Sequence, residues 1–327
     1  MNLPEDIYSL PLKIKIKSGE LVELNAVYQD TKPKGSSLGT FLTIHGAPGS
    51  HKDFKYITPR LMEAGIRVIG INFPGLGWTP GDLRLYYDNH ERNQCIQQII
   101  NNLDLKNIVF CGHSRGTENA IMMAATNQER TSGVVLLNPT GLSRHKGIRP
   151  EWAVNALATA ARTWGLRALN EAFLYQFYTR VLKFKVKTSS ECAVCVQYMS
   201  QCALGDQREF IEDLNKNDKI KVVICAAGKD HLVEKHILKD LISTFKDSPL
   251  IEVNSSGDEE ETSELMRKNS EEGKIRQGFL FLSEVLAYTA PVPQGGNPPP
   301  PPPPQGGNPP PPPQGEPTGA PVIPIIA

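Results

Sequence analysis

The sequence predicts an α/β fold, a mostly parallel central sheet with helices on both faces. Three observations predict it. Short apolar runs of strand length recur along the chain, amphipathic runs of helical period alternate with them, and a Gly-x-Ser-x-Gly turn joins one such strand to the next helix. Helices that cover both faces of a parallel sheet leave its strands almost uniformly apolar. With 327 residues, 39% of them hydrophobic, the chain is long enough to bury such a core.

The first element is predicted to be a β-hairpin. Residues 12–16 and 21–27 alternate apolar and polar side chains on either side of Ser18-Gly19, as expected of half-buried strands joined by a turn. After the hairpin, strands and helices alternate. The predicted strands are 41–45, 66–72, 107–111, 133–138, 220–227 and 249–253, and the predicted helices are 54–64, one with its apolar stripe at 95–103, 115–126, 236–245 and 275–288.

Two segments depart from this alternation. Residues 151–213 are mostly helical in pattern, so we expect about 140–215 to form a cap inserted between two strands. Ligands in such sheets bind beyond the carboxyl ends of the strands. The composition changes near residue 290, because seventeen of the 27 prolines lie at or after Pro291. We therefore expect one globular domain over 1–289 and a disordered proline-rich tail over 290–327.

Composition narrows the class of function. Lysines and arginines number 35, as do aspartates and glutamates, and this zero net charge gives no case for nucleic acid or an anionic membrane surface. The first 20 residues lack the apolar core of a signal peptide, and no apolar run is long enough to span a bilayer. Six cysteines scattered through predicted core elements favour reduced, buried thiols in a cytoplasmic protein. Cys192 and Cys195 lack a second pair or a nearby histidine, so no metal site is predicted.

The Gly-x-Ser-x-Gly turn predicts a nucleophile. It reads Gly112-His113-Ser114-Arg115-Gly116, and it lies between the apolar run 107–111 and the helical run 115–126. A sharp strand-to-helix turn holds a serine hydroxyl out of the fold, where a base and hydrogen-bond donors can reach it. Gly112 and Gly116 are expected because side chains at these positions would clash with neighbouring elements.

A second loop completes a resemblance. Residues 45–50 read His-Gly-Ala-Pro-Gly-Ser and are followed by Asp53-Phe54-Lys55-Tyr56-Ile57. Together with the elbow and the strand order, this loop makes residues 12–289 resemble the α/β-hydrolase superfamily, and within it a poorly characterised branch expanded in nematodes. In that superfamily, this loop and the residue after the nucleophile each donate one backbone N–H to an oxyanion hole.

The resemblance implies specific site residues. The oxyanion-hole amides would be those of Ala47 and Arg115, and Gly46 and Gly49 would let the backbone approach a substrate closely. Residues 222–230 resemble the strand and Gly-x-Asp turn that place the catalytic acid, which would be Asp230. A turn-forming aspartate is the alternative at this position.

The expected histidine is missing from this pattern. The superfamily places it after the last strand, where this chain has Asp258 in an acidic run, and no histidine follows His236. A carboxylate with a pKa near 4 is a weak base for a serine hydroxyl. The remaining candidates are His231, which stands beside Asp230, together with His236 and His51.

The sequence therefore predicts a serine hydrolase that acts on an ester or related acyl substrate, with an incomplete triad. The alternative is a catalytically inactive binding protein that keeps the hydrolase fold. No metal or organic cofactor is implied. The cap aromatics could line an acyl pocket or simply pack (Trp152, Trp164, Phe173, Phe177 and Tyr178), and the basic run 144–149, which includes His145, is interpreted as a solvated face. The proline runs within 298–313 could bind a polyproline-recognising protein.

Overall fold

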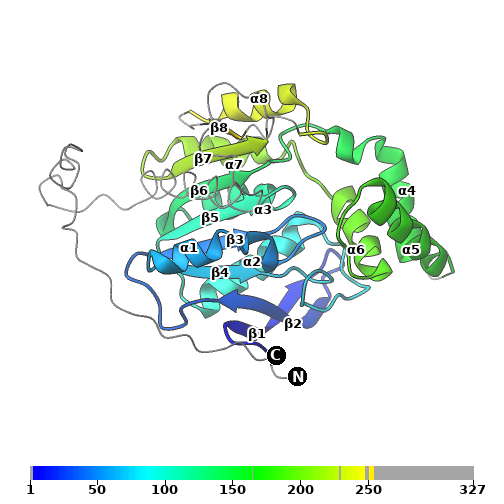
Figure 1. Ribbon diagram of the computed structural model, residues 1–327, viewed down its shortest axis with the longest axis horizontal. Helices are drawn as coiled ribbons and strands as arrows, with labels where there is room; N and C mark the ends of the chain where they lie inside the picture. Colours follow the sequence, from blue (N-terminus) through cyan, green and yellow to red (C-terminus); the bar gives the residue numbers. More distant parts are fainter. Residues whose placement is uncertain (1–2, 164, 228–229, 247–249, 254–327) are drawn as a thin grey trace, which may run out of the picture. The chain divides into compact units, whose positions relative to one another are not determined.

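A central sheet of eight strands organises the molecule (Figure 1). The computed structural model describes residues 3–163, 165–227, 230–246 and 250–253. The strand order across the sheet is β1-β2-β4-β3-β5-β6-β7-β8. The strands are β1 (Ile7–Lys15), β2 (Leu21–Asp30), β3 (Thr40–Ile44), β4 (Arg67–Ile71), β5 (Ile108–His113), β6 (Thr131–Leu137), β7 (Lys221–Ala227) and β8 (Leu250–Val253).

The two edges of the sheet differ in strand direction. β1 and β2 form the predicted antiparallel hairpin, and β2 also pairs antiparallel with β4. From β4 to β8 every neighbouring pair is parallel, with Phe41 of β3, for example, opposite Val109 of β5. The carboxyl ends of β3, β5, β6 and β7 therefore meet at one edge, where ligands of such sheets bind.

Helices cover both faces of the sheet, as the sequence predicts. The α-helices of the body are α1 (Thr58–Glu63), α2 (Asn89–Asn102), α3 (Gly116–Thr126), α7 (Gln207–Asn215) and α8 (Lys235–Thr244). α1 packs on β4, and its Leu61 joins a core cluster with Phe41 and Val109. On the other face, α2 and α3 contribute Ile96 and Ile121 to the larger cluster. The core thus lies in two layers separated by the sheet.

One predicted helix is shorter than expected. In place of a helix over 54–64, the chain forms a 3₁₀ turn at His51–Phe54 and then α1 at Thr58–Glu63. Pro59 stands in the first turn of α1, where its missing N–H and fixed φ are tolerated. Inside a helix, a proline removes a hydrogen bond and clashes with the preceding turn. The α-helix therefore begins next to Pro59 and does not run through from residue 54. The helix predicted at 275–288 and the tail after 290 lie outside the described residues.

The chain between β6 and β7 forms the cap. Its helices are α4 (Glu151–Arg162), α5 (Arg167–Gln176), a π-helical turn η4 (Phe177–Val181) and α6 (Ser189–Ser200), and α4 and α5 both pack on α6. α7, the last helix before β7, packs on α3 of the body. All six cysteines are buried thiols. Among the residues that the structure describes, no helix has the length and apolar character needed to cross a bilayer.

Candidate active site

Ser114 lies in a strained turn at the carboxyl end of β5. Its φ of 50° is in the left-handed region, which side chains other than glycine rarely adopt. The Ser114 N–H donates to the Leu137 carbonyl at the end of β6 (2.9 Å), and its carbonyl accepts from the Thr117 N–H in the first turn of α3 (3.0 Å). The surrounding hydrogen bonds hold this conformation, which is the geometry expected of a nucleophile elbow.

The two elbow glycines allow a close approach of backbones. A Cβ on Gly112 would lie 2.7 Å from the Gly116 carbonyl oxygen. A Cβ on Gly116 would collide with the carbonyl oxygen of Ile44 and lie 2.7 Å from that of His45. Real Cβ atoms do not come this close to backbone oxygens, so only glycine lets the elbow fold onto the end of β3.

The loop after β3 lies directly against Ser114. A Cβ on Gly46 would stand 3.0 Å from the Ser114 Cβ. His45 anchors this loop, because its Nδ1 donates to the Gly46 carbonyl (2.7 Å) and its Nε2 accepts from the Phe73 N–H (3.1 Å). Burial lowers the pKa of His45 to about 3, so the ring is neutral at pH 7 and both nitrogens are occupied.

A cavity of about 460 Å³ opens over these elements. Ser114, Ala47 and Asp230, which the sequence assigns to nucleophile, oxyanion hole and acid, all line it. Neither the Ala47 nor the Arg115 backbone N–H donates to an acceptor among the described residues. The cavity thus brings together the Ser114 hydroxyl, the unoccupied Ala47 amide and a carboxylate, and Arg115, which follows Ser114 directly, is buried and is not among its lining residues.

All seven histidines of the chain lie within the described residues, so the structure places every candidate histidine base. His231 and His236 are exposed, and neither lines the cavity. His51 is buried outside it, with its Nδ1 3.0 Å from Asn72 Oδ1 and its ring edge-on to Trp78. Asp258 lies outside the described residues. Only His113 and His145 among the histidines line the cavity.

The burial of His145 contradicts the prediction that the basic run 144–149 is a solvated face. Its side chain is only 3% exposed, whereas Arg144 and Lys146 on either side are exposed. The Gly147 N–H donates to its Nδ1 (3.1 Å), and its Nε2 is buried without a partner among the described residues. Burial lowers the pKa of His145, and the nearby Leu232 backbone, then Asp230 and Glu118, oppose that effect. A neutral imidazole with one unsatisfied nitrogen therefore stands in the wall of the cavity.

Asp230 faces both of these histidines. Its negative charge raises the pKa of His113 and of His145 against the larger effect of burial, which lowers both. Its Oδ1 accepts from the Leu232 and Val233 N–H groups (2.7 and 3.0 Å). Asp230 therefore stabilises a local turn, which is the alternative role that the sequence allows for it. It also lines the cavity.

A second carboxylate stands at the cavity wall. The Asp53 side chain is exposed overall, but its carboxyl group lies beside Gly49, and desolvation there raises the pKa of Asp53 to about 6. Glu191 from the start of α6 acts in the same direction and also lines the cavity. Asp53 is thus partly protonated near pH 6.

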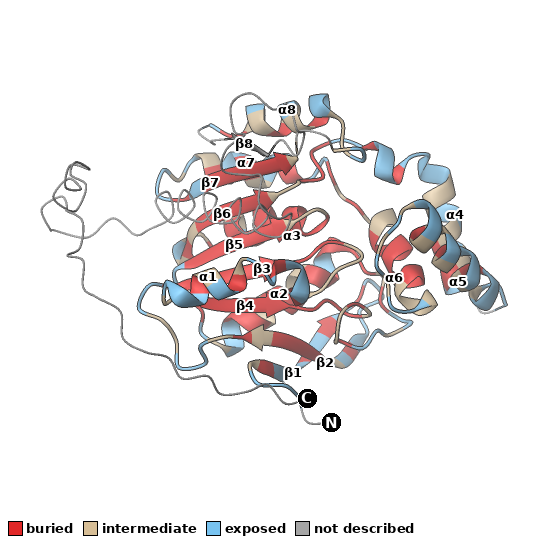
Figure 2. Ribbon diagram, viewed as in Figure 1, coloured by how far each residue is buried: buried red, intermediate tan, exposed pale blue. Residues whose placement is uncertain are grey.

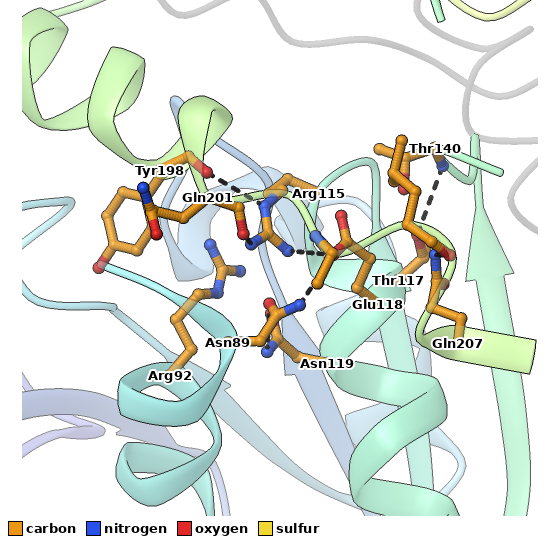
Figure 3. A network of polar contacts seen from close by, with 12 residues as sticks. Asn89, Arg92, Arg115, Thr117, Glu118, Asn119, Thr140, Tyr198, Gln201 and Gln207 are labelled. Atoms are coloured by element: carbon orange, nitrogen blue, oxygen red, sulfur yellow. Dashed lines mark hydrogen bonds and ion pairs between the residues drawn. The ribbon is translucent and has the colours of Figure 1, made fainter. Parts of the chain in front are cut away.

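A buried ionic network lies beneath the elbow (Figure 3). Arg115 and Glu118 are fully buried, and Arg115 Nη1 lies 2.9 Å from Glu118 Oε2. The Arg115 guanidinium also donates to the Tyr198 and Gln201 carbonyls (3.4 and 3.1 Å), and the Ala203 N–H donates to Glu118 (3.1 Å). The side chains of the elbow helix therefore hold the carboxyl end of cap helix α6.

The network carries an unbalanced positive charge. Arg92 of α2 is buried beside it, with its guanidinium 3.8 Å from the centre of the Phe73 ring, and it donates to the His45 carbonyl (3.2 Å). Its Nε and Nη1 have no partner among the described residues, and burial followed by repulsion from Arg115 lowers its pKa to about 9. Two guanidinium groups thus face one carboxylate, Glu118, behind the loop that presents Ala47.

The cap aromatics divide between the cavity and solvent. Tyr178 is buried and lines the cavity with Leu182 and Phe184. Trp152 and Phe173 do not line the cavity and are 74% and 54% exposed, although the Phe173 ring stacks on that of Phe177. Trp164 lies outside the described residues.

The strand order, the elbow and the loop after β3 define an α/β-hydrolase-fold protein. More narrowly, the chain belongs to the family described as alpha/beta hydrolase of unknown function (DUF1057), whose model matches residues 5–281. It is 27% identical over 272 residues to the uncharacterized protein F35H12.5 of Caenorhabditis elegans, a match that covers 80% of this chain and 76% of that protein.

Two further similarities bear on the fold and the class. A serine hydrolase-like protein of Dictyostelium discoideum is 31% identical over 113 residues, which cover 34% of this chain and 31% of that protein. The structure of a thermophilic esterase from Thermogutta terrifontis superposes with a TM-score of 0.58 at 15% identity, covering 85% of this chain and 99% of the esterase. At that identity the likeness establishes the fold alone.

Proposed function

We propose that the chain is a serine hydrolase that cleaves an ester or a related acyl substrate, with Ser114 as the nucleophile. The observation that carries this proposal is the strained backbone of Ser114 at the floor of a cavity that Ala47 also lines. Strain of this kind costs about 1–3 kcal/mol and persists where the surrounding structure enforces it, commonly at active sites. The similarity to a serine hydrolase-like protein supports the same class.

The reaction follows from the groups in the cavity. Ser114 Oγ attacks the carbonyl carbon of the ester as its proton passes to a base, and negative charge develops on the carbonyl oxygen. The Ala47 and Arg115 amides would donate to this oxygen, and loss of one such donor typically costs on the order of 10²–10³ in rate. Collapse of the tetrahedral intermediate expels the alcohol, which takes up the proton. Water then attacks the acyl-serine and releases the acid by the same steps.

We assign the base to His145. It lines the cavity with Ser114, it is neutral because burial lowers its pKa, and Asp230 stabilises its protonated form. The Gly147 bond makes Nδ1 an acceptor in the resting arrangement, so Nε2 carries the proton. Base catalysis at Nε2 requires that this bond be given up, at a cost of about 0.5–1.5 kcal/mol. We therefore expect a slower enzyme than one with a preformed triad, by up to about tenfold from this cause.

The same hydrogen bond favours a second function. If the Gly147 bond persists when a ligand binds, His145 presents an N–H donor and cannot accept the Ser114 proton. The cavity would then bind a ligand with an acceptor atom, and the chain would be a catalytically inactive binding protein.

Covalent labelling by a fluorophosphonate probe tests the proposal. The wild-type chain should react, and Ser114→Ala should not. Ser50→Ala is the matched control, because Ser50 lines the same cavity and its loss should leave labelling intact. His145→Asn keeps an acceptor for the Gly147 amide but cannot act as a base, so its labelling should fall at least tenfold while its melting temperature changes little. Absence of labelling in a folded wild-type chain would favour the binding protein, and full labelling of His145→Asn would remove His145 as the base.

A further inference from the structure

The outer face of α5 and η4 carries an apolar stripe turned to solvent. We call its residues the α5 stripe: the exposed Leu166, Leu169, Phe173 and Val181, together with Phe177, which is partly buried against the core. Their spacing of three or four residues places them on one face of the helix. Leu169, Phe173 and Val181 are 75%, 54% and 64% exposed, and the Phe173 and Phe177 rings stack with centres 6.3 Å apart.

The neighbouring face of the same helix is already packed. Asn170, Leu174 and Tyr178 are buried, and α5 lies against α6 on that side (Figure 2). A surface helix normally turns its polar face to water. The α5 stripe instead turns apolar side chains to water, so this face has the character of a contact surface and not of a solvated one.

Positive charge surrounds the end of the stripe. Residues 152–187 contain six lysines and arginines but one acid, Glu171, although the whole chain is neutral. Glu171 pairs with Arg167, and Arg162 donates to the Leu85 carbonyl. The four basic residues that remain, Arg180, Lys183, Lys185 and Lys187, are exposed and form no ion pair within the described residues.

We propose that α5 and η4 form a peripheral docking surface for an anionic phospholipid bilayer. The α5 stripe would enter the boundary between headgroups and acyl chains, and the basic residues after it would contact lipid phosphates and carboxylates. Apolar side chains beside lysines and arginines are the combination that binds such surfaces, since each supplies one part of the attraction.

The cavity lies behind the same segment. Leu182 and Phe184, which follow the stripe directly in sequence, line the cavity that contains Ser114. Docking would therefore place the cavity wall next to the bilayer. If the proposed hydrolase activity holds, the substrate class that this arrangement favours is a lipid-derived ester.

Co-sedimentation of the full chain with vesicles tests the docking surface without any substrate. The chain should bind vesicles of phosphatidylcholine mixed with phosphatidylserine and bind phosphatidylcholine alone much more weakly. Arg180→Gln combined with Lys183→Gln removes two charges outside the cavity lining. Each is worth about fivefold at an anionic surface, so binding should weaken roughly 30-fold. Leu169→Glu combined with Phe173→Glu should abolish binding.

Leu38→Glu is the matched control, because Leu38 is an equally exposed apolar residue of the body (54%) and its replacement should leave binding unchanged. Failure of the folded wild-type chain to bind phosphatidylserine vesicles would overturn the proposal. It would also be overturned if the Leu169 and Phe173 substitutions left binding intact, or if they only converted a dimer to a monomer, which would make the stripe a contact between two copies. None of these outcomes depends on fluorophosphonate labelling of Ser114.

Discussion

Replacement of Glu118 by glutamine should destabilise the chain because it leaves two buried guanidinium groups without a carboxylate. Glutamine keeps an oxygen for the Asn89 amide and the Ala203 N–H, which donate to Glu118 over 2.8 and 3.1 Å, so the substitution removes mainly the charge. Breaking a buried ion pair from one side costs about 3–5 kcal/mol. At a urea dependence of about 3 kcal/mol per molar, the unfolding midpoint should fall by roughly 1 M or more.

The Arg92→Met background tests the origin of this loss. Methionine can still pack on Phe73, and without Arg92 the network is neutral before Glu118 is changed and carries one positive charge afterwards. Glu118→Gln should therefore cost about 1–2 kcal/mol less in that background than in the wild type. Urea unfolding followed by circular dichroism would measure the free energy that Glu118→Gln costs in each of the two backgrounds. A loss under about 1 kcal/mol in the wild type, or equal losses in the two backgrounds, would refute the argument from unbalanced charge.

Three other predictions concern protons and close approach. Burial lowers the pKa values of four histidines, His45, His51, His113 and His145, so the unfolded chain takes up protons before the folded chain as the pH falls below 6.5. The urea midpoint of unfolding should therefore decline below that pH. A urea midpoint that stays constant between pH 7 and 5 would contradict this. The pKa of Asp53 is raised to about 6, so its contribution to stability is present at pH 4 and is lost as the pH rises through 6, and Asp53→Asn should remove that part of the profile. Gly116→Ala should eliminate fluorophosphonate labelling and lower the melting temperature, whereas Gly205→Ala, which meets no atom within 4 Å, should do neither.

Much of the body could be predicted from the sequence because its signals are local. The apolar run before Ser114 is the buried strand β5, and Gly112 is required by contacts within the same turn, whereas Gly116 is required by the end of β3. The loop at 45–50 lies against the elbow because parallel strands bring their carboxyl ends to one edge. These features follow from periodicity and chain direction alone.

His145 escaped prediction because its neighbours in sequence are charged. Leu142, His145 and Ile148 are buried at a spacing of three, while Arg144 and Lys146 between them are exposed. That period could have indicated an inward-facing histidine, but in so short a segment it is weak beside the charges. For Phe173 of the α5 stripe the error is the reverse, because the sequence predicts a pocket wall or packing and the side chain is exposed. A helical row of apolar residues has the same pattern whether it faces a core or solvent.

Arg115 links the elbow to the cap, two parts of the molecule that could otherwise change independently during evolution. Its backbone lies in the elbow, and its guanidinium is satisfied by carbonyls at the carboxyl end of α6. A transplanted cap that lacked those carbonyls would leave Arg115 Nε and Nη2 without acceptors in the interior, with Glu118 as the remaining partner of the guanidinium. Caps of this kind are therefore not modular: new specificities would arise by substitution within the existing cap, and a grafted cap would have to bring its own elbow residue with it.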